Sequence, residues 1–302
     1  MSETNEAWSD FWARQGAGQS TGCLPARWQS VFAELEREWR CFSEALPQGA
    51  KVLDLATGDG RVLHWLGQAR GDIERVGVDL APHLPPPPPG ATVEPAVPME
   101  DLPFGKDQFD GVVSQFGIEY GNPPAIAREI AQVAKDDARI AFVVHRADGA
   151  ILAHNLTRAE HIRWVLDEIG LIAATKAAIA EEAAPWADAT AMAAEMAAEG
   201  ARRFGDRSAA WEIPEAIRQS LVMGARAGDT AQGVSGLLDQ IETQARNELA
   251  RIASLEEACR TAAARDSFIE AFEAAGIVLA ESCALHDAAG RVFGEMLHFH
   301  PD

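Results

Sequence analysis

The sequence predicts an α/β protein with a doubly wound, mostly parallel sheet that ends in an antiparallel hairpin. An apolar run at 51–55 leads into a glycine turn and a helical pattern, as at the start of a strand–turn–helix unit. Strand-like and helical runs then alternate up to residue 145, which is typical of a parallel sheet. After a long helical stretch, residues 268–300 show a helix, a strand, a turn and a final strand, which predicts the hairpin.

The glycine turn is the most informative segment of the chain. In KVLDLATGDG, residues 51–60, Asp54 lies near the end of the strand, and Gly58 and Gly60 form the turn before the helix. A strand, a glycine turn and a helix N-terminus together let the backbone approach a ligand closely. The next strand ends in Asp79, where a carboxylate can accept hydrogen bonds from both hydroxyls of a ribose. The pattern therefore predicts a cofactor that contains a nucleoside.

Two classes of cofactor use this geometry, and the residues around the turn separate them. A dinucleotide-binding turn has the pattern G-x-G-x-x-G, but position 63 is Leu. Asp54 instead gives the pattern D-x-x-x-G-x-G, and a carboxylate at that place suits a ligand with positive charge. This segment resembles motif I of the class I S-adenosylmethionine (SAM) methyltransferases.

Two further segments extend the resemblance. Residues 99–104, MEDLPF, precede the strand at 109–114, which leads into QFGIEY at 115–120. DLATGDG together with SQFGIEYG is similar to the ubiquinone and menaquinone C-methyltransferases and their small-molecule relatives. The similarity covers residues 45–146 and returns near the C-terminus. It implies a Rossmann-like sheet of seven strands with an inserted helical lid, SAM as the cofactor and S-adenosylhomocysteine as the product.

The resemblance also implies which residues touch the cofactor. Asp101 would lie near the adenine amino group, with Met99 or Glu100 beside the base. The candidate cofactor-binding residues all lie in or beside the matched motifs: Asp54, Ala56, Thr57, Gly58, Gly60, Asp79, Leu80, Met99, Glu100, Asp101, Gln115 and Phe116.

The methyl acceptor is expected at the open tips of the fourth and fifth parallel strands, in reach of Gln115 and three candidate catalytic residues. Those three are His145, Tyr120 and Glu119. A histidine at a strand tip can act as a base near neutral pH, but a histidine that caps the strand or contacts the cofactor explains His145 equally well. Tyr120 and Glu119 are candidates to line the acceptor pocket. A base is needed only for a neutral hydroxyl, an acidic carbon or an ammonium acceptor.

One tempting motif has a structural explanation. Asn122-Pro123-Pro124 resembles the start of the N-P-P-aromatic signature of amino-methylating enzymes, but the next residue is Ala125. Asn as the N-cap and Pro at the first helical position explain the tripeptide without chemistry. We therefore expect a helix start here.

The composition limits the class of partner. The chain has 46 acidic residues against 26 Lys and Arg, a formal net charge of −20, whereas binding to nucleic acid uses clustered Lys and Arg. We therefore expect a small-molecule acceptor and no nucleic acid. The four scattered cysteines predict reduced thiols rather than a disulfide or zinc framework, and no metal site is expected: Cys23, Cys41, Cys259 and Cys283. The polar N-terminus and the absence of a membrane-length apolar run predict a cytoplasmic protein without a signal peptide.

Four segments are expected along the chain. Residues 1–46 would form an N-terminal helical cap, 47–148 the SAM-binding core, 149–265 a helical insertion or lid, and 266–302 the helix and hairpin that complete the core. The cap contains an amphipathic helix at 26–46. Its aromatic segment, Trp8 to Arg14, is either a lid over the cofactor or a terminal helix packed on the core.

The insertion is Ala-rich, and its helical periodicity predicts four to six helices, with a homodimer interface as one possible use. Breaks are expected near Gly170, Pro185, Gly205-Asp206 and Pro214, and over Gly224 to Gly236. Within the core, the run Pro85 to Pro89 predicts a stiff, extended loop in place of the helix that usually follows the second strand.

These observations predict a SAM-dependent methyltransferase that acts on a small organic acceptor. Methylation of oxygen or carbon is favoured over methylation of nitrogen. Two alternatives remain open at this point: methylation of a protein or peptide side chain, and a SAM-binding protein without turnover.

Overall fold

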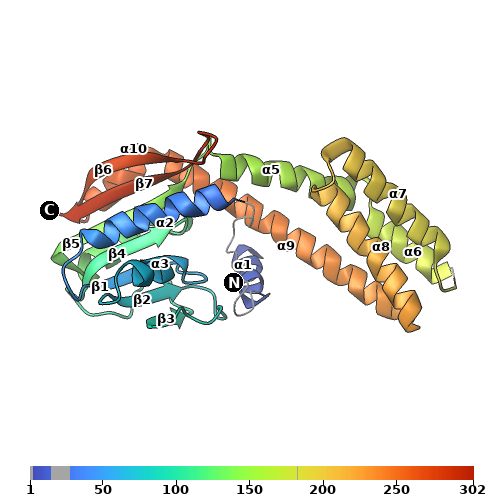
Figure 1. Cartoon of the computed structure of the whole chain (residues 1–302), viewed down its shortest axis with the longest axis horizontal. Helices are drawn as coiled ribbons and strands as arrows, with labels where there is room; N and C mark the ends of the chain where they lie inside the picture. The colour runs from blue at the N-terminus through green and yellow to red at the C-terminus, as the bar shows by residue number, and fades with distance from the viewer. Residues whose placement is uncertain (1–2, 15–27, 182) are drawn as a thin grey trace. The chain divides into compact units, whose positions relative to one another are not determined.

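The computed structural model describes residues 3–14, 28–181 and 183–302, which form two compact units (Figure 1). The first unit comprises Met1–Ala153 and Ala253–Asp302, and the second comprises His154–Ile252. Cys23 and the part of the predicted cap at 15–27 lie outside the described residues. Residues 149–153 and 253–265, assigned above to the insertion, belong to the first unit, and the four-segment division stays a prediction.

A seven-stranded sheet forms the centre of the first unit, in the order β3-β2-β1-β4-β5-β7-β6. The first five strands pair in parallel, and β7 is antiparallel to both β5 and β6, which confirms the predicted fold class. The strand order reverses between β1 and β4, and ligands of such sheets bind at the carboxyl ends of the strands there. The strands are β1 (Lys51–Leu55), β2 (Glu74–Asp79), β3 (Ala91–Pro95), β4 (Phe109–Gln115), β5 (Ala134–His145), β6 (Ile277–His286) and β7 (Val292–Pro301).

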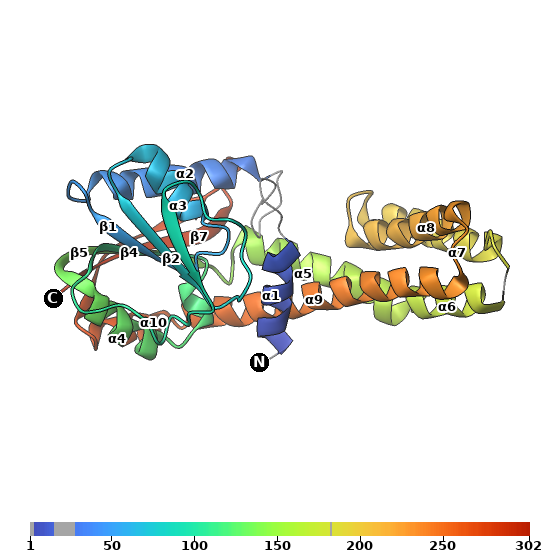
Figure 2. The ribbon, with the colours of Figure 1, turned by 90° about the horizontal axis from the view of Figure 1, so that it is seen from below.

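Helices cover both faces of the sheet (Figure 2). Val52 and Leu53 are neighbours in β1, and they enter two different apolar clusters because successive strand residues face opposite sides. The Val52 cluster contains the apolar sides of α2 and α3, and the Leu53 cluster contains those of α4 and α10. These helices are α2 (Gln29–Glu44), α3 (Arg61–Ala69), α4 (Pro123–Val133) and α10 (Arg265–Glu273).

The proline run forms a loop, as predicted, but the strand that follows it, β3, is not evident in the sequence. Its five residues are half-buried or exposed, as expected at a sheet edge. Arg75 holds the loop: its guanidinium donates hydrogen bonds to the carbonyls of Leu63, at 2.9 Å, and Pro89, at 3.0 Å. Pro88 lies so close to Gly60 that a Cβ there would be 2.7 Å from the proline Cδ. The loop therefore packs against the glycine turn.

The second unit is helical. Five α-helices and one π-helical turn run through residues 150–263, and the boundaries between the units fall within α5 and α9. They are α5 (Ala150–Arg163), η2 (Trp164–Glu168), α6 (Leu171–Glu181), α7 (Ala187–Phe204), α8 (Ala209–Ala227) and α9 (Ala231–Ala263).

The break expected at Pro214 is wrong, because this residue lies inside α8, whereas the break expected between Gly224 and Gly236 is found between the end of α8 at Ala227 and the start of α9 at Ala231. Proline cannot donate to the carbonyl four residues earlier, which here belongs to Ala210. That carbonyl lies against Gly200 of α7, where a Cβ would be only 2.0 Å from the oxygen. The glycine lets the two helices approach closely at this point, and the proline is accommodated in the helix.

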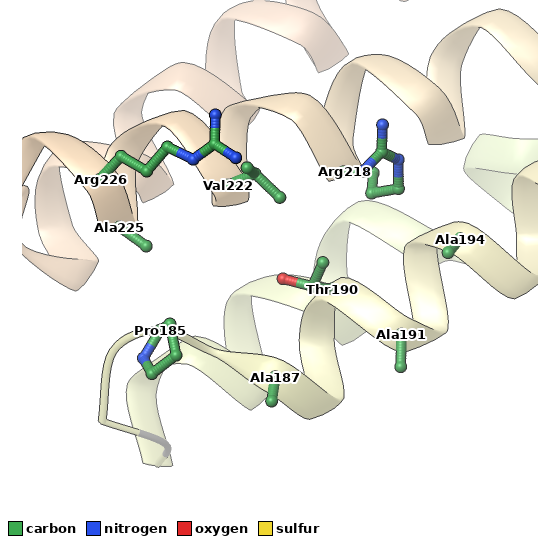
Figure 3. Close-up of a pocket in the computed structure, with 9 residues that line it drawn as sticks. All are labelled: Pro185, Ala187, Thr190, Ala191, Ala194, Arg218, Val222, Ala225 and Arg226. Atoms are coloured by element: carbon green, nitrogen blue, oxygen red, sulfur yellow. The ribbon is translucent and has the colours of Figure 1, made fainter.

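A groove of about 560 Å³ lies between α7 and α8 (Figure 3). Arg218 and Arg226 project from α8, and Thr190 lies opposite them on α7. The remaining lining is mostly alanine, and none of the nine lining residues is His, Cys, Asp or Glu. Apart from the Thr190 hydroxyl, the described lining thus offers no nucleophile or general base, whereas the predicted site residues lie at the strand tips of the first unit.

Candidate cofactor and acceptor site

The glycine turn after β1 has an unusual backbone. Ala56, Gly58 and Gly60 all have left-handed φ angles, of 54°, 53° and 71°. Such angles are easy for glycine and uncommon for alanine, so the turn is tightly constrained. Thr57 donates its backbone N–H to the carbonyl of Val78 at 2.9 Å, which ties the turn to the neighbouring strand β2.

Asp79 completes the connection between the two strands. Its Oδ2 accepts the N–H of Gly58 at 2.9 Å, and its Oδ1 accepts the N–H of Ala81 at the same distance. Burial raises the pKa of Asp79, while the two hydrogen bonds oppose that rise. The adjoining Leu80 is 51% exposed, so an apolar side chain stands in solvent beside the carboxylate.

Asp54 is a buried carboxylate below the turn. Only 1% of it is exposed, and its Oδ2 accepts a hydrogen bond from the Thr57 hydroxyl at 2.6 Å. Burial raises the pKa of Asp54 to about 8, and the negative charges of Asp79 and Asp59 add to the effect. Within the described part of the chain, Asp54 has no ion-pair partner. A carboxylate in this environment favours a ligand that brings a positive charge.

The loop before β4 is fastened to the start of α4. Glu100 accepts the backbone N–H of Asn122 at 2.8 Å, so this carboxylate connects the loop to the start of α4. Asp101, by contrast, is exposed. Met99 is partly buried against the core. Asn122 caps α4 by accepting the N–H of Ala125 at 3.1 Å, which confirms the structural explanation of the Asn-Pro-Pro motif.

The tip of β4 lies next to the glycine turn. A Cβ on Gly117 would be 2.5 Å from the Cβ of Ala56, so the two loops are in contact. Gln115 directs its amide oxygen to α2, where it accepts the indole N–H of Trp39 at 2.8 Å. Phe116 has a φ of 55°, and its ring centroid lies 4.3 Å from that of His145. Of these two candidate cofactor residues, Phe116 thus faces the tip of β5, and Gln115 is engaged with a helix.

The tips of β4 and β5 bring the three candidate catalytic residues together. His145 donates its backbone N–H to Oε1 of Glu119 at 2.8 Å, and its Nδ1 lies 2.7 Å from the same oxygen. The Glu119 side chain is fully buried, and that of His145 is 8% exposed. The Tyr120 ring lies 6.0 Å from the imidazole, nearly perpendicular to it.

Helix α1 (Glu3–Arg14) adds two aromatic side chains to these tips. Trp8 packs edge-on against Tyr120, with ring centroids 5.8 Å apart, and donates its indole N–H to the Ser254 hydroxyl at 3.3 Å. Trp12 is buried against Gly58, because a Cβ there would be 2.5 Å from its ring. These tryptophans lie outside the set of site residues predicted from the sequence, although their spacing of four predicts a shared helix face.

The described part of the chain contains no group of three or more His, Cys, Asp or Glu side chains that could hold a metal ion. None of its helices is long and apolar enough to cross a membrane.

Comparison with known proteins identifies the class of domain. Residues 27–200, more than half of the chain, match the family model described as a methyltransferase domain. No curated protein matches the sequence.

Solved structures similar to this chain include a chain of the Haloferax volcanii complex that contains the Trm112 methyltransferase activator. That likeness has 15% identity and a TM-score of 0.43, and covers 90% of this chain and 93% of the other. A TehB-like SAM-dependent methyltransferase from Corynebacterium glutamicum has 20% identity and a TM-score of 0.31, over 39% of this chain and 69% of the other. A SAM-dependent methyltransferase from Aquifex aeolicus has 17% identity and a TM-score of 0.32, over 41% and 69%. At these identities the likeness concerns the fold alone.

Proposed function

Because this chain belongs to the methyltransferase-domain family of class I SAM-dependent enzymes, we propose that it binds SAM and methylates a small organic acceptor. Oxygen or carbon is favoured over nitrogen as the acceptor atom. Membership of the ubiquinone and menaquinone branch stays a prediction. The observation that carries the proposal is the joined unit of the glycine turn and Asp79, which adjoins the tips of β4 and β5.

The side chains around the turn suit SAM in charge and polarity. Its ammonium and sulfonium would favour the ionised form of Asp54, which burial alone disfavours, and its ribose hydroxyls would donate to Asp79. Leu80 and Met99 offer apolar surface for the base, and Asp101 is free in the described structure to approach its amino group. The proposed cofactor set is Asp54, Ala56, Thr57, Gly58, Gly60, Asp79, Leu80, Met99, Glu100, Asp101, Gln115 and Phe116.

The proposed acceptor side consists of His145, Tyr120 and Glu119. When bound, SAM supplies the activated methyl group, so the protein must orient the acceptor and exclude water. Trp8 and Trp12 of α1 cover the strand tips and the glycine turn, which supports a small acceptor over a macromolecular one. The net charge of −20 also disfavours a nucleic-acid acceptor.

Calorimetric titration with S-adenosylhomocysteine, with NAD in parallel, tests the cofactor. We expect the wild type to bind S-adenosylhomocysteine only and Asp79→Asn to bind it more weakly. Asp137→Asn is the matched control, because Asp137 is exposed near the start of β5. Binding of NAD, or of neither ligand, would contradict the proposal.

Incubation with methyl-labelled SAM then tests the acceptor. Label in small hydroxylated or carbon-acid compounds supports the proposal, whereas label in protein alone supports a protein-modifying enzyme. Binding of S-adenosylhomocysteine without transfer to any acceptor would favour a SAM-binding protein without turnover.

A further inference from the structure

The buried contact between Glu119 and His145 carries an inference about the acceptor. We propose that His145 Nε2 accepts the proton of a hydroxyl on an sp² carbon, as in a phenol or enol, and that Glu119 is the positioning residue for this imidazole. The inference rests on the proposed function and narrows its acceptor to one chemical class, methylated on oxygen.

Two donors of one residue converge on a single carboxylate oxygen. The backbone N–H and the Nδ1 of His145 lie 2.8 and 2.7 Å from Oε1 of Glu119. Since Oε1 already accepts the backbone N–H, a proton on Nδ1 gives it a second donor. In a neutral imidazole, a proton on Nδ1 leaves the lone pair on Nε2. The carboxylate therefore selects the tautomer in which Nε2 can act as a base.

Aromatic rings hold the imidazole in this orientation. Phe116 lies against its face, with a centroid distance of 4.3 Å and an interplanar angle of 31°. Tyr120 meets it edge-on at 6.0 Å. The fixed ring leaves Nε2 on the side opposite Glu119. A planar acceptor would fit beside the rings of Phe116, Tyr120 and His145, because aromatic rings pack well by stacking and edge contacts.

Glu119 and His145 form a buried pair at the tips of β4 and β5. In the described residues, His145 is its ion-pair partner, and Oε2 is buried with no hydrogen bond. The other titratable groups near the pair are Tyr120 and Cys259 of α9. Burial, followed by the charges of Glu119 and Glu256, raises the pKa of Cys259 to about 12, so this thiol stays neutral. A proton that passes to Nε2 during the reaction would thus lie on a ring that contacts one buried carboxylate.

A structural role alone does not account for Glu119. The backbone N–H of His145 needs one acceptor, which a neutral amide would supply. Among the described residues the buried second oxygen of Glu119 has no hydrogen-bond partner, and such groups are uncommon in folded proteins. A carboxylate supplies a negative charge that an amide lacks, and this charge is useful if the neighbouring imidazole gains a proton.

Proton affinity selects the acceptor class. In water, a phenol such as that of tyrosine and an imidazole differ by about 3.5 pKa units, a gap that proton transfer during the reaction can cross. An aliphatic hydroxyl, comparable to water at about 15.7, is much less acidic. A neutral amine has a free lone pair and needs no base. As the acceptor oxygen bonds to the methyl carbon and the carbon–sulfur electron pair returns to sulfur, the hydroxyl proton passes to Nε2, and water later removes it.

Nitrogen NMR of the histidine rings in the S-adenosylhomocysteine complex tests the pair. We expect the neutral ring of His145 to carry its proton on Nδ1 and to leave Nε2 bare, and Glu119→Gln to weaken this preference, because an amide oxygen accepts a hydrogen bond less strongly than a carboxylate. His145→Asn assigns the signals, and His298→Asn on β7 is the control expected to leave the tautomer of His145 unchanged. A protonated Nε2 in the neutral ring of the wild type, or an unchanged tautomer preference in Glu119→Gln, would overturn the proposal.

The absorbance of 4-nitrophenol tests the acceptor class, because phenol and phenolate absorb differently. Added to the S-adenosylhomocysteine complex below its own pKa, it should ionise in the wild type and in His298→Asn but not in His145→Asn. An unchanged spectrum with the wild type would overturn the assignment to phenols and enols. Because S-adenosylhomocysteine binding is measured on the same samples, its absence would indicate failure of the proposed function itself.

Discussion

The carboxylate of Asp79 accepts the backbone N–H of Gly58 at 2.9 Å, so the acid at the tip of β2 also holds the glycine turn after β1. One side chain therefore maintains the shape of the turn and, in the proposed function, offers oxygens to the ribose. Changes at this residue are expected to affect both the stability of the turn and the binding of the cofactor.

Asp79→Ala should weaken S-adenosylhomocysteine binding by about 1–3 kcal/mol, the usual range for a hydrogen bond to a charged group. Titration calorimetry measures this change, and a thermal melt shows whether the variant remains folded. Unchanged affinity would remove the assignment of Asp79 to the ribose.

Gly58→Ala should displace Trp12. The new Cβ would lie 2.5 Å from the indole, and the residue would keep a φ near 53°. We expect a loss of about 1–3 kcal/mol in urea unfolding, from steric overlap and backbone strain together. The double variant Gly58→Ala, Trp12→Ala should lose less than the sum of the single changes, because the overlap disappears. Additive losses would show that Trp12 does not pack on the turn.

Gly200→Ala should destabilise the helical unit by about 1–3 kcal/mol, because its Cβ would meet the backbone oxygen of Ala210. Gly236→Ala is the matched control: this glycine lies in α9 with no atom within 4 Å of the added Cβ. We expect the control to be neutral or to stabilise by up to about 1 kcal/mol, as usual for Ala in a helix. Equal effects in urea unfolding would argue against the close α7–α8 contact.

Asp54 should make stability depend on pH in an unusual direction. Its pKa in the folded protein, about 8, lies above the ordinary aspartate value of 3.8, so protonation favours the folded state. That contribution is complete below about pH 4 and is lost as the pH rises through about 8. Relative to Asp54→Asn, the wild type should lose stability across this interval. Urea unfolding at several pH values checks it, and parallel curves would contradict a raised pKa.

Most of the fold was predictable because each β-strand and helix of the core has its own apolar pattern. β3 was not, since its five half-buried or exposed residues show no strand pattern, and it forms at the sheet edge beside β2. Pro214 was misjudged for a different reason. Whether a proline ends a helix depends on what its freed carbonyl meets, and here Gly200 of another helix lies against that carbonyl.

The sequence motifs predicted which loops form the candidate site, but not the side-chain contacts between those loops. Asp54, Gly58 and Asp79 belong to one strand–turn–helix–strand unit, from β1 through α3 to the end of β2, and their spacing along the sequence is enough to predict it. The bond between Glu119 and His145 joins residues 26 positions apart on two loops, so only the strand register brings them together. The hydrogen bond between Gln115 and Trp39 also joins residues that are far apart in the sequence, and the resemblance to the methyltransferases did not predict it.

The proline run before β3 has a consequence for self-association. β3 is an edge strand, and such edges can recruit strands from other molecules. Proline offers no N–H donor, so residues 85–89 cannot extend a hydrogen-bonded ladder, and β3 itself ends at Pro95 after five residues. The chain on both sides of this edge thus limits how far an intermolecular sheet could grow from it, which protects the protein against aggregation there.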